Sequence, residues 1–126
     1  MYKRSFFFLL VLASLTLIAG ACSIKMQVQA STKARMGTSD FIDKEVAIKK
    51  GESIALVDTT SSTHIISNGT WQGNTAKPFI ESGAPVVNNL NFAGNDSKNV
   101  GPFNTAGTFQ LYCTIHPGMN LTVTVT

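Results

Sequence analysis

The chain has 126 residues, of which 44% are hydrophobic, a length and composition that predict one small globular domain. Its formal net charge is only +3, and its lysine and arginine residues form no clustered basic face. No nucleic-acid-binding motif occurs either, which excludes nucleic acid as a partner.

Residues 1–21 have the layout of a secretory signal peptide. Lys3 and Arg4 precede an uncharged apolar core at residues 6–18, and the small residues 19–21 follow it. This core is too short to cross a bilayer comfortably, which argues against a retained membrane-spanning helix. Removal of the segment lowers the net charge to +1, so charge says little about partners.

Cys22 directly follows these small residues, an arrangement that resembles the bacterial lipobox, in which the cysteine becomes the lipidated first residue. Ala19 stands where that motif usually has a leucine-like residue, and ordinary cleavage after Ala21 or Ala30 stays open as an alternative. A diacylated or triacylated Cys22 would hold the domain at a membrane surface. If Cys22 is lipidated or removed, Cys113 is an unpaired thiol in an oxidising compartment, a liability unless something such as a metal uses it.

Two regions follow the signal. Residues 22–39 are polar and small with no sustained period, which predicts a flexible tether spanning roughly 23 Å as a random coil. Residues 40–126 are predicted to form the single folded domain. Within it we expect strands at 46–49, 53–57, 64–67, 90–92, 108–113 and 121–126.

Turn residues separate these predicted strands. The first two strands are expected to form a hairpin or to pair across a sandwich edge, and Asn68-Gly69 is expected to be a turn. Residues 72–91 read as a long connection, with Val86-Val87 packed inward. No helical period runs through the chain, so the predicted fold class is an all-β sandwich. The aromatic side chains expected in the core are Trp71, Phe79, Phe92, Phe103 and Phe109.

The stretch from Cys113 to Met119 has the pattern C-x-x-H-x-x-M, which places a thiolate, an imidazole and a thioether within seven residues. Alternation of the preceding strand turns Cys113 toward the core, and His64, the only histidine besides His116, lies on another predicted strand. Soft sulfur donors beside imidazole favour copper, and one Cys, two His and a weak axial Met describe a blue-copper site. Zinc fits less well because Met is a poor zinc ligand. A Cys–His nucleophile lacks an orienting third residue and an oxyanion loop.

The segment 107–119 resembles the C-terminal copper loop of cupredoxins, and within that family it is similar to the plastocyanin and amicyanin branch. The resemblance extends over residues 41–126 and implies a Greek-key β-sandwich around one type 1 copper ion. It also implies a ligand set with three equatorial members and one axial member, namely His64, Cys113 and His116 with Met119.

One residue departs from the family pattern. Cupredoxins usually carry Asn directly after the upstream histidine, where it ties that segment to the residue following the cysteine. Ile65 occupies this position, so Thr114 is expected to find another partner, such as the backbone or Ser67.

The resemblance implies an exported electron carrier, not an enzyme, that cycles between Cu(II) and Cu(I). Redox proteins would dock weakly near His116 and Pro117 on a monomer in the periplasm or at the outer face of the bacterial cytoplasmic membrane. Two alternatives stay open. One is a copper chaperone, storage or sensing protein with the same ligands, and the other is a structural β-sandwich adhesion module.

Overall fold

The fold is seen in a computed structural model that describes residues 30–126. The predicted signal peptide, Cys22 and the segment 22–29 lie outside the described residues. The described part contains nine strands and no helix, and so none that could cross a membrane. The strands are β1 (Thr32–Met36), β2 (Glu45–Ile48), β3 (Ile54–Asp58), β4 (His64–Gln72), β5 (Thr75–Pro78), β6 (Leu90–Phe92), β7 (Ser97–Val100), β8 (Gly107–Cys113) and β9 (Asn120–Val125).

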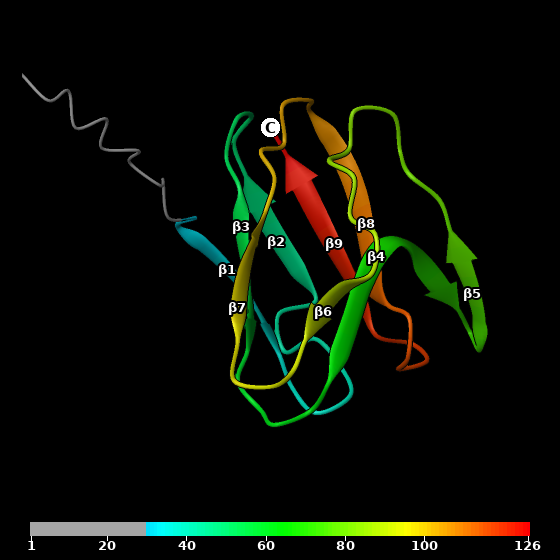
Figure 1. The fold of residues 1–126 in the computed structure, drawn as a ribbon. Helices are drawn as coiled ribbons and strands as arrows, with labels where there is room; N and C mark the ends of the chain where they lie inside the picture. The colour runs from blue at the N-terminus through cyan, green and yellow to red at the C-terminus, as the bar shows by residue number, and fades with distance from the viewer. Residues whose placement is uncertain (1–29) are drawn as a thin grey trace, which may run out of the picture.

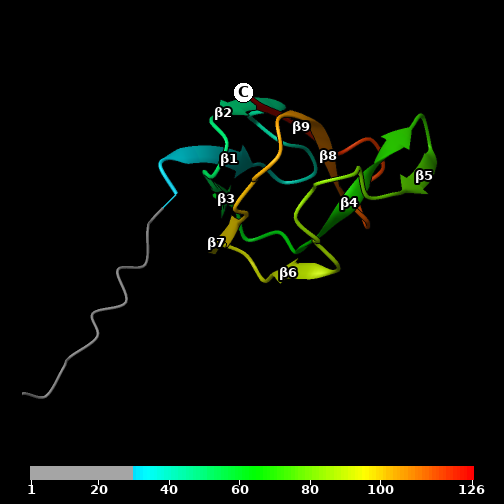
Figure 2. The same ribbon diagram turned by 90° about the horizontal axis from the view of Figure 1, so that it is seen from above.

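The strands form two sheets, as the all-β prediction requires. One has the order β1-β3-β7, and the other has the order β2-β9-β8-β4-β5, with β6 also paired to β4 (Figure 1). Seen from above, β1, β3 and β7 lie on one side of the molecule and β9, β8 and β4 on the other (Figure 2). The two central strands β8 and β9 are antiparallel neighbours, and the loop that joins them is the C-x-x-H-x-x-M segment.

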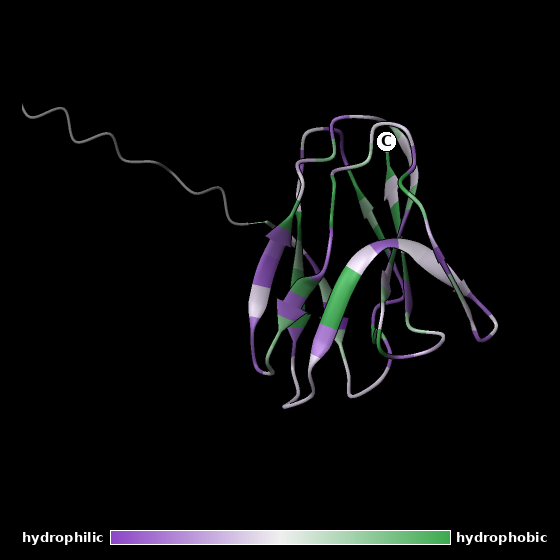
Figure 3. Ribbon diagram, turned by 45° about the vertical axis from the view of Figure 1, so that its right-hand side comes forward, coloured by the Kyte–Doolittle hydropathy of each residue, from purple (hydrophilic) through white to green (hydrophobic). Residues whose placement is uncertain are grey.

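Alternating side chains build the core between these sheets. Phe109 and Leu111 of β8 are buried, as are Leu121, Val123 and Val125 of β9. Figure 3 shows hydrophobic and hydrophilic residues mixed along the strands, which is typical of sheets with one covered face. The expected core positions of three aromatic residues are confirmed, namely Phe92, Phe103 and Phe109.

The tether predicted for residues 22–39 is wrong in its second part, because residues 32–36 form strand β1. This strand pairs in parallel with β3, and its Ala34 and Met36 are completely buried. The pattern has only two inward apolar residues between polar ones, so the sequence resembles coil. The strand is stabilised by its partner β3, and the folded domain therefore begins before residue 40.

Arg35 of β1 holds the strand to the turn that follows it. Its guanidinium Nε donates to Asp43 Oδ2 at 2.8 Å and its second terminal nitrogen to Oδ1 at 2.8 Å, while the Arg35 backbone N–H also donates to Oδ2 at 2.9 Å. These hydrogen bonds lower the pKa of Asp43 from its usual 3.8 to about 2.

The carboxylate of Asp43 therefore binds a proton less readily in the folded chain than in the unfolded chain. We expect its stabilisation to be complete above about pH 4 and to disappear as the pH falls toward about 2. The effect is modest because the pair is solvent-screened. Urea midpoints should be lower for Asp43→Asn than for wild type near neutral pH and should converge at about pH 2. The exposed Glu45→Gln substitution is the control, and a gap that persists at low pH would contradict the assignment.

Two local predictions are corrected by the topology. Strands β2 and β3 are not a hairpin, because β2 pairs in parallel with β9 while β3 is the middle strand of the other sheet. Asn68-Gly69 is not a turn but the middle of β4. Gly69 has φ 128°, and a Cβ there would lie 2.4 Å from the carbonyl oxygen of Lys77. Glycine is needed here because the backbone of the paired strand β5 lies too close to leave room for a side chain.

The long connection before β6 runs mainly over the surface. Phe79 is 41% exposed and Val86 is 74% exposed, so their predicted inward packing is wrong. Only Val87 is buried, and its backbone N–H donates to the side-chain oxygen of Asn68 at 2.6 Å. The prediction of a core position for Trp71 is wrong, because its side chain is half-buried beside the C-x-x-H-x-x-M loop.

Candidate metal centre

Three of the predicted ligands meet at one end of the sandwich. His64 begins β4, Cys113 ends β8, and His116 lies in the loop that follows. Their donor atoms all lie within 4.8 Å of one another. The sulfur of Cys113 is 3.4 Å from Nδ1 of His116 and 3.9 Å from Nδ1 of His64. Both imidazoles therefore turn the same nitrogen toward the thiol, which is the arrangement that a shared metal ion requires.

The candidate ligands differ in their access to solvent. His64 and Cys113 are completely buried, and so is Met119, whereas His116 is half-buried. Ile115, next to His116, is 46% exposed. The site is thus closed on the protein side and reaches the surface through one imidazole.

The loop folds back on itself through its own backbone. The N–H of Cys113 donates to the carbonyl of Met119 at 3.0 Å, and the N–H of Met119 donates to the carbonyl of His116 at 3.1 Å. Gly118 lies at φ 81°, a left-handed conformation that other residues adopt only with strain. These bonds bring the buried Met119 back to the base of the loop, beside Cys113.

The position that departs from the family pattern is compensated by the backbone. The N–H of Thr114 donates to the carbonyl of Ile65 at 2.8 Å, so the two ligand-bearing segments are tied without an Asn side chain. The expectation of a backbone partner for Thr114 is therefore confirmed. Ser67, the other expected partner, instead accepts from the N–H of Asn89 at 2.9 Å.

A buried carboxylate lies near the Nε2 atom of His64, a feature that the sequence did not reveal. Oδ1 of Asp58 is 3.8 Å from Nε2 of His64, and both side chains are completely buried. Burial lowers the pKa of His64 below its ordinary value, an effect that the Asp58 charge opposes and His116 reinforces. The lower pKa favours neutral imidazole, the form that binds metals. Oδ1 of Asp58 also accepts bonds from the backbone and hydroxyl of Thr60, both at 3.0 Å.

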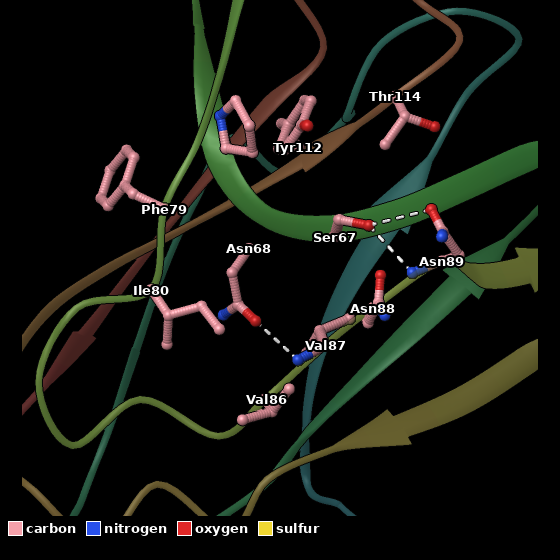
Figure 4. A pocket seen from close by; sticks show the side chains of 11 residues that line it. Ser67, Asn68, Phe79, Ile80, Val86, Val87, Asn88, Asn89, Tyr112 and Thr114 are labelled. Carbon is pink, nitrogen blue, oxygen red and sulfur yellow. Dashed lines mark hydrogen bonds between the residues drawn. The ribbon is translucent and has the colours of Figure 1, made fainter.

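A shallow groove of about 460 Å³ lies beside the loop. Tyr112 and Thr114, the two neighbours of Cys113, line one side of it, and Phe79, Ile80 and Val86 line the other. Figure 4 shows these side chains and the hydrogen bonds of Asn68 and Ser67 across the groove. No charged residue in the described part of the chain lines the groove, so its surface is neutral there.

The arrangement has the fold and donor chemistry of a cupredoxin. Amicyanin from Paracoccus versutus (Thiobacillus versutus) is a similar solved structure, with a TM-score of 0.58 and 21% identity over 79% of this chain and 83% of that one. A reduced amicyanin variant also matches, with a TM-score of 0.58 and 16% identity over 78% of this chain and 84% of that one. Identities this low show a shared fold.

The family model of copper binding proteins of the plastocyanin/azurin family matches residues 26–126. The chain belongs to this family, and it is a copper protein of the electron-carrier kind. No curated protein sequence matches it. The donors fit copper as cofactor, since a thiolate and two imidazoles converge while the loop also carries a buried thioether.

Proposed function

We propose that the protein is an exported, non-enzymatic electron carrier that binds one copper ion through His64, Cys113, His116 and Met119. The first three would be equatorial ligands and Met119 the weak axial one. The observation that carries the proposal is the convergence of three donors within 4.8 Å in a chain of a copper-binding family. Copper supplies a reversible one-electron change between Cu(II) and Cu(I) when bound. Reversible one-electron voltammetry of the copper-loaded protein tests the proposal, and an irreversible response would contradict it.

The protein's part in this function is to hold the donors still. The N–H of Cys113 donates to the carbonyl of Met119, and the N–H of Thr114 donates to the carbonyl of Ile65, so the loop is held at both of these points. A thiolate with a thioether and imidazoles suits both oxidation states of copper, so little needs to move when the charge changes. A preorganised site of this kind favours rapid electron exchange.

Partners are proposed to dock where His116 reaches the surface. The half-buried imidazole lies between Ile115 and Pro117, both of which are exposed and uncharged. Such a small apolar surface supports weak, transient contacts, and redox encounters belong to the smallest class of protein interfaces. We propose that the carrier works as a monomer.

Export and anchoring rest on the sequence before residue 30. Residues 1–21 would be cleaved, a lipid on Cys22 would anchor the chain at the outer face of the cytoplasmic membrane, and residues 22–29 would form a short tether of roughly 16 Å. Mass spectrometry of the membrane fraction should find acyl chains on Cys22. An unmodified N-terminus at Ser31 would contradict the anchor.

A copper chaperone, storage or sensing protein would use the same ligands. Hand-over of copper requires an acceptor to reach the ligands in turn, but His64, Cys113 and Met119 are completely buried. The burial favours electron transfer over ion transfer. Slow electron exchange together with rapid copper hand-over to an acceptor protein would reverse this preference. Membership of a copper-binding family leaves the adhesion alternative without support.

Asp58→Asn is expected to raise the reduction potential of the bound copper. The Asp58 carboxylate lies 3.8 Å from Nε2 of His64 in a buried environment, where a negative charge stabilises the more positive oxidised ion. Voltammetry of wild type and variant measures the shift. Glu52→Gln removes the same charge from an exposed turn and should leave the potential nearly unchanged. An unaltered or lower potential in Asp58→Asn would contradict this role.

A further inference from the structure

The second half of β4 and strand β5 form an arm, which lies beside the metal centre. Strand β4 pairs with β8 only from Ile66 to Asn68, and then bends near Gly69. Its second half pairs with β5 and turns back toward the end of the molecule that carries the loop (Figure 1). Trp71 lies in this second half, opposite Ala76 of β5.

Trp71 contacts the residue that carries the thiol. Its indole Nε1–H donates to the backbone carbonyl of Cys113 at 2.8 Å. Its ring also packs edge-to-face against Tyr112, with ring centroids 6.0 Å apart and an interplanar angle of 82°. The orientation of the indole is therefore set by an aromatic contact and a hydrogen bond together.

The other end of the loop is held by the same residue. The backbone N–H of Trp71 donates to Oδ1 of Asn120 at 2.7 Å, and Nδ2 of Asn120 donates to the Trp71 carbonyl at 3.1 Å. The Asn120 side chain thus pairs with the Trp71 backbone as a neighbouring strand would. Cys113 and Asn120 flank the loop, so one residue of the arm fixes both of its ends.

We infer that Trp71 and Asn120 are positioning residues of the metal centre, which hold the ends of the ligand loop at a fixed separation so that the donors stay in place before copper binds. The inference rests on the proposed function for its purpose, but its geometry is independent of the metal. The three bonds go to Cys113 and to the residue after Met119 and not to the hydrophobic core. We call these three bonds the clamp. Its loss should therefore loosen the loop more than the sandwich.

Amide hydrogen exchange of the metal-free protein tests the clamp. Trp71→Phe keeps an aromatic ring against Tyr112 but removes the indole donor. It should speed exchange of the Cys113 and Met119 amides by roughly two- to tenfold, since a typical hydrogen bond is lost. The Val123 amide, in the β8–β9 ladder, should not change. Asn120→Ala should give the same pattern, and it serves as the second variant if Trp71→Phe folds poorly.

Gln72→Ala is the matched control, because Gln72 is the next residue of β4 and is exposed. It should leave all of these amides at the wild-type rate. In the copper-loaded protein, Trp71→Phe should shift the thiolate-to-copper absorption band and speed loss of Cu(I) to bathocuproine disulfonate by a similar factor. Gln72→Ala should do neither.

Two results would overturn the inference: unchanged exchange at Cys113 and Met119, or exchange accelerated equally throughout the domain. The second result would show a general stabilising role only. The outcome is separable from that of the proposed function. Loop-specific acceleration in a protein that gives no blue copper colour would support the clamp and contradict the electron carrier, while normal colour with unchanged exchange would do the reverse.

Discussion

Cys113→Ser is expected to abolish the intense visible absorption of the copper-loaded protein. That absorption arises from charge transfer between a thiolate and Cu(II), and Cys113 is the only cysteine among the described residues. Its sulfur is central to the donor cluster, lying 3.4 Å and 3.9 Å from the two histidine nitrogens. A serine hydroxyl is a harder and weaker donor, so copper affinity should fall with the colour. Absorption spectra at matched copper additions measure the colour, and competition with a copper chelator measures the affinity.

Folding must be preserved for this loss to be informative. Serine is close to cysteine in size, so the metal-free variant should unfold at a urea concentration near that of the wild type. Thr114→Ser, one position further along, keeps the backbone bond to Ile65 and should retain full colour. A blue Cys113→Ser protein would show that the thiolate was assigned wrongly.

Ala34→Asp is expected to destabilise the domain severely. Ala34 is completely buried in β1, where it is paired with Leu56 of β3. A carboxylate placed there would be buried without a partner, at a cost on the order of several kcal/mol. The free energy of unfolding of a native protein is only about 5–15 kcal/mol, so much of the stability would be lost. Urea unfolding measures the change in the free energy of unfolding.

Lys33→Glu is the matched control on the exposed side of the same strand. It should change the free energy of unfolding by no more than about 0.5 kcal/mol. If residues 32–36 were a tether, both substitutions would be nearly neutral. Equal, small effects would therefore contradict the strand.

The ligand loop could be predicted because its information is local. The spacing of Cys113, His116 and Met119 is short, and the alternation of β8 alone turns Cys113 inward. His64 could be predicted as the second imidazole ligand because it is the only histidine in the sequence besides His116. Central strands such as β8 and β9 also carry long alternating patterns, which distinguish them from coil.

The features that were missed depend on residues far apart in sequence. β1 is a strand because β3 lies beside it, and Asn68-Gly69 lies within a strand because Asn68 pairs with β8 and Gly69 pairs with β5. Asp58 reaches His64, and Trp71 reaches Cys113 and Asn120, only through the packing of the sandwich. No spacing rule connects these pairs.

Titration of the metal-free protein with Cu(II), followed by visible absorption, decides whether His64, Cys113, His116 and Met119 form a blue-copper site. An intense thiolate-to-copper band that saturates at about one copper ion per chain is expected, as a site with a single thiolate requires. Cu(II) that binds without an intense visible band, or that does not bind at all, would contradict it.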